Sequence, residues 1–383
     1  MATRNKTFSL AFLLSLFFLP GCSPKHPADK SELFSEADTL TVHSELLTLV
    51  RLNEGITLVE IKNPWKPEEK LNSFLLVDKE VDVNDLPSVA DYRKITVPVK
   101  SALVYSSVHM APLIEIGSED VITGIADLEY ISDNTIRKRI SDGQIVDIGN
   151  SMSPSLEKII ALSPQIALIS PYQNSGHGVL DNTNIEVIDM ADYMETTPLG
   201  RAEWIKLLGL LTGKYEKTDS IYNEISERYD NIKHKTASHF DSKTRPLVIT
   251  EIPFNGVWYQ PGQKSYMATL IHDAGGRTLD VGEQTNGSVQ LDIATVLNKG
   301  ANSDIWLIKT TQNLNHIKDL EQILPSASLI KAYRDKNVWY CNTTESNLYD
   351  DLAFHPELIL TDFVNIIFGD NASQNRYFVK PEE

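Results

Sequence analysis

Residues able to do acid–base or covalent chemistry are present in this chain of 383 residues, but they lack the spacing that catalysis needs. The nine histidines are scattered, and the patterns G-x-S-x-G, H-E-x-x-H and C-x-x-C do not occur. The segment G-L-L-T-G-K-Y is one residue too short for a phosphate-binding loop and has Tyr215 where Ser or Thr is required. The sequence therefore favours binding without catalysis; an enzyme and a passive adhesion protein or scaffold are the alternatives.

Cys22 has surroundings that predict a covalent modification. Arg4 and Lys6 precede a short apolar run that ends at Leu19, and Gly21 lies directly before the cysteine. A basic start, a short apolar run and a small residue at the end are typical of an export signal. The sequence L-P-G-C resembles the bacterial lipobox, in which the cysteine thiol is acylated. We expect lipidation of Cys22; an ordinary secretory signal with an incidental cysteine is the alternative.

The remaining composition limits the partners and the compartment. If Cys22 carries lipid, Cys341 has no partner for a disulfide, and its place in the run N-V-W-Y-C predicts a buried, inert thiol. The net charge of −17 argues against nucleic acid or an anionic membrane surface as a partner. An apolar content of 42% can supply the cores of two domains.

The chain divides into segments that differ in their pattern of apolar and polar residues. Short alternating runs with turn residues predict a small antiparallel β-rich region, whereas strand–loop–helix units later in the chain predict parallel sheets covered by helices. A run of ~23 helical residues would span about 35 Å and could link two lobes. We expect an α/β fold with two three-layer lobes joined by one long backbone helix. The expected segments are a signal peptide (1–21), a flexible tether (22–37), a β-rich N-terminal extension (38–98), a first lobe (99–213), the linking helix (214–237) and a second lobe (244–371).

Two motifs then carry a resemblance to a known family. S-L-E-x-I-x-A-L-x-P-x-I-A-L-I-S at 155–170 and L-L-G-x-L-T-G at 207–213 stand in the order found in helical-backbone (class III) periplasmic substrate-binding proteins of ABC importers. The resemblance covers roughly 99–369 and is closest to the iron-siderophore and cobalamin group; the extension with N-P-W at 63–65 resembles Bacteroidetes members. It implies a monomeric, non-enzymatic lipoprotein on the periplasmic side of a bacterial membrane. It also implies a permease homodimer with its ATPase as partner, and no resident cofactor.

The resemblance also implies one acidic docking residue on each lobe. Glu157 matches the position in the first lobe, and Asp292 matches that in the second lobe, where the family usually has glutamate. Such carboxylates can pair with arginines on two permease subunits, and their effect is mainly on orientation and encounter rate. The alternative is that both simply favour the positive ends of two helices.

Ligands of open α/β lobes bind beyond the carboxyl ends of the strands, which here is the cleft between the lobes. The loops expected there are rich in Tyr, Trp, Ser and Asn, and we expect contacts from Tyr105, Ser106, His109, Tyr130, Tyr172, Trp258, Tyr259 and Lys309. Aromatic faces with polar tips suit a large, amphiphilic metal chelate. Few bases lie on these loops, which leaves a neutral chelate or cobalamin open as the ligand. We expect an iron complex, that is, a ferric siderophore or haem, and cobalamin is the alternative.

His109 is the most specific candidate for a metal ligand, because metal-binding relatives in the same superfamily have a histidine ligand after the first strand. A bare Zn or Mn site needs three or four His, Asp or Glu ligands, and no His-rich loop supplies the others. We therefore do not expect a directly bound metal ion. The alternative for His109 is a hydrogen-bonding residue at the start of a helix.

Overall fold

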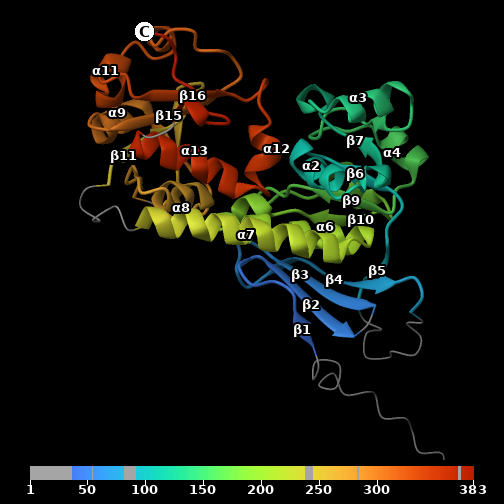
Figure 1. Cartoon of the computed structure of the whole chain (residues 1–383). Helices are drawn as coiled ribbons and strands as arrows, with labels where there is room; N and C mark the ends of the chain where they lie inside the picture. The colour runs from blue at the N-terminus through green and yellow to red at the C-terminus, as the bar shows by residue number, and fades with distance from the viewer. Residues whose placement is uncertain (1–36, 54, 82–91, 238–244, 283, 370–371) are drawn as a thin grey trace, which may run out of the picture.

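The computed structural model describes residues 37–53, 55–81, 92–237, 245–282, 284–369 and 372–383. Two α/β lobes stand on one side of the long helix α7 (Tyr215–Ala237), and a small β-sheet lies on its other side (Figure 1). This arrangement confirms the predicted fold of two lobes joined by a helix. The expected signal peptide and Cys22 lie outside the described residues. Within the described ranges, no helix is long and apolar enough to cross a membrane.

The N-terminal sheet has five strands in sequence order. Four pair antiparallel, namely β1 (Asp38–Thr39), β2 (Leu47–Asn53), β3 (Ile56–Lys62) and β4 (Lys70–Asp78). The fifth, β5 (Lys94–Val97), pairs parallel with β4, so the prediction of a purely antiparallel region is wrong there. Lys94–Val97 of β5 pair with Leu75–Asp78, the second half of β4.

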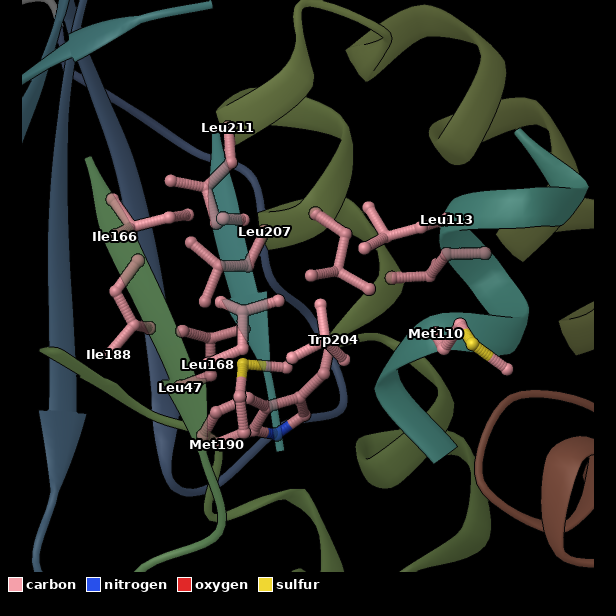
Figure 2. Packing of buried hydrophobic residues seen from close by; sticks show 14 of the residues in the cluster. Leu47, Met110, Leu113, Ile166, Leu168, Ile188, Met190, Trp204, Leu207 and Leu211 are labelled. Carbon is pink, nitrogen blue, oxygen red and sulfur yellow. The ribbon is translucent and has the colours of Figure 1, made fainter. Parts of the chain in front are cut away.

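This sheet shares a hydrophobic core with the first lobe. Alternate residues of β2, β3 and β4 point inward, as the two-residue period of a strand requires, and Leu47, Val59 and Phe74 belong to the same buried cluster as Trp204. Figure 2 shows Leu47 among side chains of the lobe, including Leu168. The extension is therefore an integral part of the first lobe's core.

Two buried glutamates hold the segment that leads into β2. The carboxylate of Glu203 accepts hydrogen bonds from the backbone N–H groups of Val42, His43 and Ser44, at 2.8 to 3.0 Å. Glu195 accepts from the Ser44 hydroxyl, from the backbone of residues 45 and 46, and from the Trp204 indole. Neither glutamate side chain is exposed to solvent. The N–H groups of an irregular segment are thereby satisfied inside the protein.

The first lobe is a parallel sheet of order β10-β9-β6-β7-β8. One face packs against α2 (Ser107–Glu115) and α6 (Ile205–Thr212), and the other against α4 (Leu156–Leu162). Its strands are β6 (Ala102–Val104), β7 (Ile122–Ile125), β8 (Val146–Asp147), β9 (Ile166–Ile169) and β10 (Glu186–Asp189); α3 (Asn134–Ser141) and α5 (Pro198–Ala202) lie in its connections.

The second lobe has a parallel sheet of order β13-β11-β15-β16 and an antiparallel pair, β12 with β14. Tyr377 and Phe378 pack into its core, so this lobe extends beyond the predicted end at residue 371. Its strands are β11 (Leu247–Thr250), β12 (Val257–Pro261), β13 (Arg277–Thr278), β14 (Ser288–Asp292), β15 (Ile305–Thr310) and β16 (Val338–Asn342). Its helices are α8 (Tyr266–Asp273), α9 (Ile293–Gly300), α10 (Asp319–Ile323), α11 (Lys331–Arg334), α12 (Leu348–Leu352) and α13 (Pro356–Phe368).

A charged contact joins the two lobes near the linking helix. His355 Nε2 lies 3.0 Å from Glu115 Oε2 at the end of α2, and His355 Nδ1 lies 3.4 Å from Glu357 Oε1 of its own lobe. Arg228 of α7 approaches the same Glu357 oxygen at 3.2 Å. Burial alone would lower the pKa of His355, but the hydrogen bonds to Glu115 and Glu357 outweigh it and raise the pKa to about 10.

We expect Glu203→Ala to lower the free energy of unfolding by about 3 kcal/mol, because three backbone N–H groups lose their acceptor in a buried site. Urea denaturation followed by circular dichroism measures this loss. Glu227→Ala, on the exposed side of α7, is the matched control and should change the stability little. Equal effects of the two substitutions would show that the buried carboxylate does not hold the segment.

We expect the stability that His355 contributes to depend on pH in a defined direction. Its pKa rises from 6.5 in the unfolded chain to about 10 in the folded protein, so the contribution is complete below pH 6.5 and is lost as the pH rises toward 10. The difference in unfolding free energy between wild type and His355→Gln should therefore shrink from pH 6 to pH 10. His272→Gln, an exposed histidine, is the control; a pH-independent difference for His355→Gln would contradict the assignment.

Candidate ligand-binding cleft

A cavity of about 490 Å³ lies between the lobes, where strands of both sheets end. The first lobe contributes the loop after β6, the turn at Leu128–Tyr130 and part of α3; the second contributes the loop after β16 and α12. We call it the hydroxyl-lined cavity, because most of its side chains are Ser, Thr or Tyr. These are Tyr105, Ser106, Ser107, Tyr130, Ser132, Thr311, Thr343, Thr344, Ser346 and Tyr349.

The charged groups in the hydroxyl-lined cavity are mainly acidic. Asp127, Glu129 and Asp350 line it together with one guanidinium, that of Arg137, whose Nε donates to the Ile131 carbonyl oxygen at 2.6 Å. Burial, together with the neighbouring Asp351 carboxylate, raises the pKa of Asp350 to about 6. A strongly anionic ligand would meet more carboxylates than cations here.

The hydroxyl of Tyr105 is buried and has no hydrogen-bond partner among the described residues. Burial raises the pKa of this phenol to about 12, so it stays protonated at neutral pH and can donate. A buried hydroxyl without a partner is costly unless a ligand or water satisfies it. Tyr105 is also one of the residues that line the cavity.

A second cavity of about 300 Å³ adjoins the first, since Tyr349 lines both. Arg201 of α5 and Tyr193 come from the first lobe, while Lys309 and Tyr259 come from the second. We call it the arginine-lined cavity. Burial alone would lower the pKa of Lys309, but the Glu251 carboxylate, 2.5 Å from its Nζ, raises it.

Five of the eight predicted contact residues line these cavities. Tyr105, Ser106 and Tyr130 line the hydroxyl-lined cavity, and Tyr259 and Lys309 line the arginine-lined cavity. Tyr172, 57% exposed, belongs to the lining of neither.

Two predicted contacts do not hold in this structure. Trp258 is fully buried against Trp306, with the ring centroids 5.6 Å apart, and its indole donates to the Thr250 carbonyl oxygen. The alternation along β12 turns Trp258 inward and leaves Tyr259 at the cavity. His109 is buried in the first turn of α2, where its Nε2 lies 2.9 Å from Asp192 Oδ1. The alternative role, a hydrogen-bonding residue at a helix start, matches this placement.

Several lining residues escaped the sequence analysis. Arg137 and Arg201 stand in segments that look like ordinary helix surface, and Tyr349 lies beyond the loop expected to reach the cleft. Thr343 and Thr344 were not named singly, but the loop at 342–347 that holds them was expected at the cleft because it follows a strand. Within the described part of the chain, no three His, Cys, Asp or Glu side chains gather as metal ligands would.

The two predicted docking acids lie at helix starts. Glu157 is exposed in the first turn of α4, and Asp292 is the exposed N-cap of α9. Hydrogen bonds from the Thr295 hydroxyl and backbone N–H lower the pKa of Asp292. Cys341 is buried in β16, as its sequence context predicted.

Comparisons with known proteins agree on the fold. An uncharacterized lipoprotein of Methanocaldococcus jannaschii is 25% identical over 295 residues, which are 70% of this chain and 68% of the relative. Three solved structures are similar at low identity. An ABC-type Fe3+-hydroxamate transport system of Saccharomonospora viridis has a TM-score of 0.53 (19% identity, covering 71% of this chain and 94% of that one). The periplasmic vitamin B12 binding protein of Vibrio cholerae also has a TM-score of 0.53 (13% identity, covering 71% of this chain and 97% of that one). A periplasmic heme binding protein of Pseudomonas aeruginosa has a TM-score of 0.55 (14% identity, covering 74% of this chain and 96% of that one).

The match to a family model covers most of both lobes. The model described as periplasmic binding protein aligns with residues 102–344, from the first strand of the first lobe to the loop after β16. That range contains α7 and nearly all residues that line the two cavities. The chain therefore belongs to the periplasmic binding protein family.

Proposed function

We propose that this protein is a lipid-anchored receptor that captures an iron complex between its lobes and delivers it to an ABC importer. The observation that carries the proposal is the hydroxyl-lined cavity, which both lobes form at the carboxyl ends of their strands. Its volume of about 490 Å³ is in the range of sites for small organic ligands. The lining offers hydrogen-bond donors and tyrosine faces but no cluster of metal ligands.

The charge of the cavity favours a chelate whose iron core is electrically neutral. With three acids and one arginine in the lining, a polyanion would be repelled, whereas a ferric trihydroxamate is neutral because its three ligand charges cancel those of iron(III). The exposed rings of Tyr130 and Tyr349 can cover the apolar surface of such a chelate while their hydroxyls bond its carbonyl groups. Cobalamin, which is bulky and also amphiphilic, is the alternative ligand of the same type.

Delivery would use the two lobes and the anchor together. Glu157 and Asp292, one on each lobe, are exposed carboxylates that can pair with arginines on two permease subunits. Lipid on Cys22 would hold the receptor at the periplasmic side of the membrane through the tether at 22–37. The lipoprotein relative from Methanocaldococcus jannaschii supports this part of the proposal.

We expect the purified lipidated protein to bind one molecule of a neutral ferric trihydroxamate without changing it. At a ligand concentration a hundredfold above Kd the complex should be about 2.7 kcal/mol more stable, which raises Tm by several degrees. Calorimetric titration gives the stoichiometry, and mass spectrometry of the recovered ligand tests for turnover.

The same titration is repeated with three comparison ligands, cyanocobalamin, haem and zinc chloride. A shift with cyanocobalamin alone would favour the corrinoid alternative, and a shift with zinc alone would favour a bare-metal receptor. Consumption of a ligand with release of product would contradict the receptor and support an enzyme.

We expect the double substitution Glu157→Arg/Asp292→Arg to abolish uptake of the chelate by cells while leaving its Kd unchanged, because the reversed charges would repel basic permease surfaces. Uptake of a radioactive iron chelate and calorimetry measure the two effects. Glu224→Arg, an exposed acid on α7, is the control for the change of charge. A weakened Kd in the double variant would place these residues in ligand binding instead of docking.

A further inference from the structure

Arg201 is deeply buried, yet its side chain forms part of the wall of the arginine-lined cavity. It lies on α5 of the first lobe and is only 6% exposed. Ser265 and Tyr266 of the second lobe line the same cavity of about 300 Å³. A buried cation in a wall shared by both lobes is positioned to meet a group bound between them.

The orientation of the guanidinium is fixed from the first lobe. Its Nε donates to Asp192 Oδ2 at 3.0 Å, and the other carboxylate oxygen of Asp192 lies 2.9 Å from His109 Nε2. Burial would raise the pKa of Asp192, but Arg201 and His109 together lower it, so the carboxylate stays ionised. The series His109, Asp192 and Arg201 therefore holds the guanidinium in one direction.

The second lobe contributes an aromatic ring that packs against the Arg201 guanidinium. The Arg201 Cζ lies 4.6 Å from the centroid of the Tyr266 ring, which is the geometry of a cation–π contact. Asp192 takes the Nε–H, and the Tyr266 hydroxyl is a second hydrogen-bond partner. The five N–H donors of a guanidinium exceed what these two partners use. The planar edge formed by its Nη groups is the part that matches a carboxylate in a bidentate arrangement.

Lys309 lines the same cavity but is differently placed. Its ammonium is paired directly with Glu251, and a compact ammonium presents no second planar edge. The cavity therefore combines one oriented guanidinium with the Lys309–Glu251 ion pair, both members of which line it, and with hydroxyl or amide groups from Ser265, Asn286 and Tyr259. This set is complementary to one small anionic group with hydrogen-bond acceptors.

We propose that the arginine-lined cavity is a subsite for a single carboxylate arm of the ligand, recognised by Arg201, while the body of the chelate occupies the adjoining hydroxyl-lined cavity. The proposal rests on the proposed function and narrows it to chelates that carry a free acid. Its volume of about 300 Å³ fits a side arm, and Tyr349, which lines both cavities, marks where the arm would leave the body.

The test uses the full lipidated protein and two probes that differ in one group. One is a ferric trihydroxamate with a pendant carboxylate, and the other is the same chelate with that carboxylate converted to its methylamide. Calorimetric titration should show that wild type binds the acid about tenfold to a hundredfold more tightly, as a charge-assisted bond in a buried site predicts.

Two variants separate recognition from folding. Arg201→Met should bind both probes as weakly as wild type binds the amide. Arg201→Lys keeps a positive charge beside Asp192, so it preserves the fold if the methionine variant does not, and it should lose most of the preference because it lacks the planar edge. Arg139→Met, which removes a cation paired with Asp120 on the same lobe, should keep the full preference.

The outcomes are distinct. A preference for the acid that disappears in the Arg201 variants supports the subsite. Equal binding of both probes by wild type, or a preference that survives Arg201→Lys and Arg201→Met, overturns the subsite while leaving the receptor intact. If wild type binds neither probe, the chelate function itself fails and the subsite falls with it.

Discussion

The helix α7 contributes side chains to the hydrophobic cores of both lobes, and this shared packing constrains the cleft. Tyr222 is buried in the core of the first lobe, and Tyr229, two helical turns later, is buried in that of the second. Their hydroxyls are also bonded, to His43 Nδ1 and to Asp273 Oδ2 respectively. A large rotation of one lobe would have to bend the helix or pull one tyrosine from its core. Both actions cost several kcal/mol, so the distance between the lobes is largely fixed before a ligand binds.

The N-terminal extension is part of the hydrophobic core of the first lobe. Its sheet lies on the side of α7 away from the two lobes (Figure 1), and its inward face completes the core that contains Trp204. Glu195 and Glu203, which hold the segment at 42–46, lie beside that tryptophan in the stretch between β10 and α6. The chain that follows the expected tether thus enters on the face opposite the lobes.

The periodicity of apolar residues along the sequence predicted the strands and helices. Contacts between residues far apart in the sequence could not be predicted in this way. Strand and helix alternation indicated both lobes, and strand ends indicated the loops that carry Tyr105 and Lys309. The same alternation could have separated buried Trp258 from Tyr259, because neighbours on a strand face opposite ways. No local signal could pair His109 with Asp192, which is 83 residues away. Such partners become visible only when the chain has folded.

The protein as a whole is acidic, and this net charge limits how its cleft can recognise an acidic group of a ligand. With a net charge of −17, the surface potential does not attract anions from a distance, so an acidic ligand group has to be recognised at contact. A surface lysine would do this poorly, because water screens it and its side chain is mobile. Arg201 is shielded from water, balanced by Asp192 and held over Tyr266. Its charge therefore acts over a short range and in one direction, which favours one correctly placed carboxylate over anions in general.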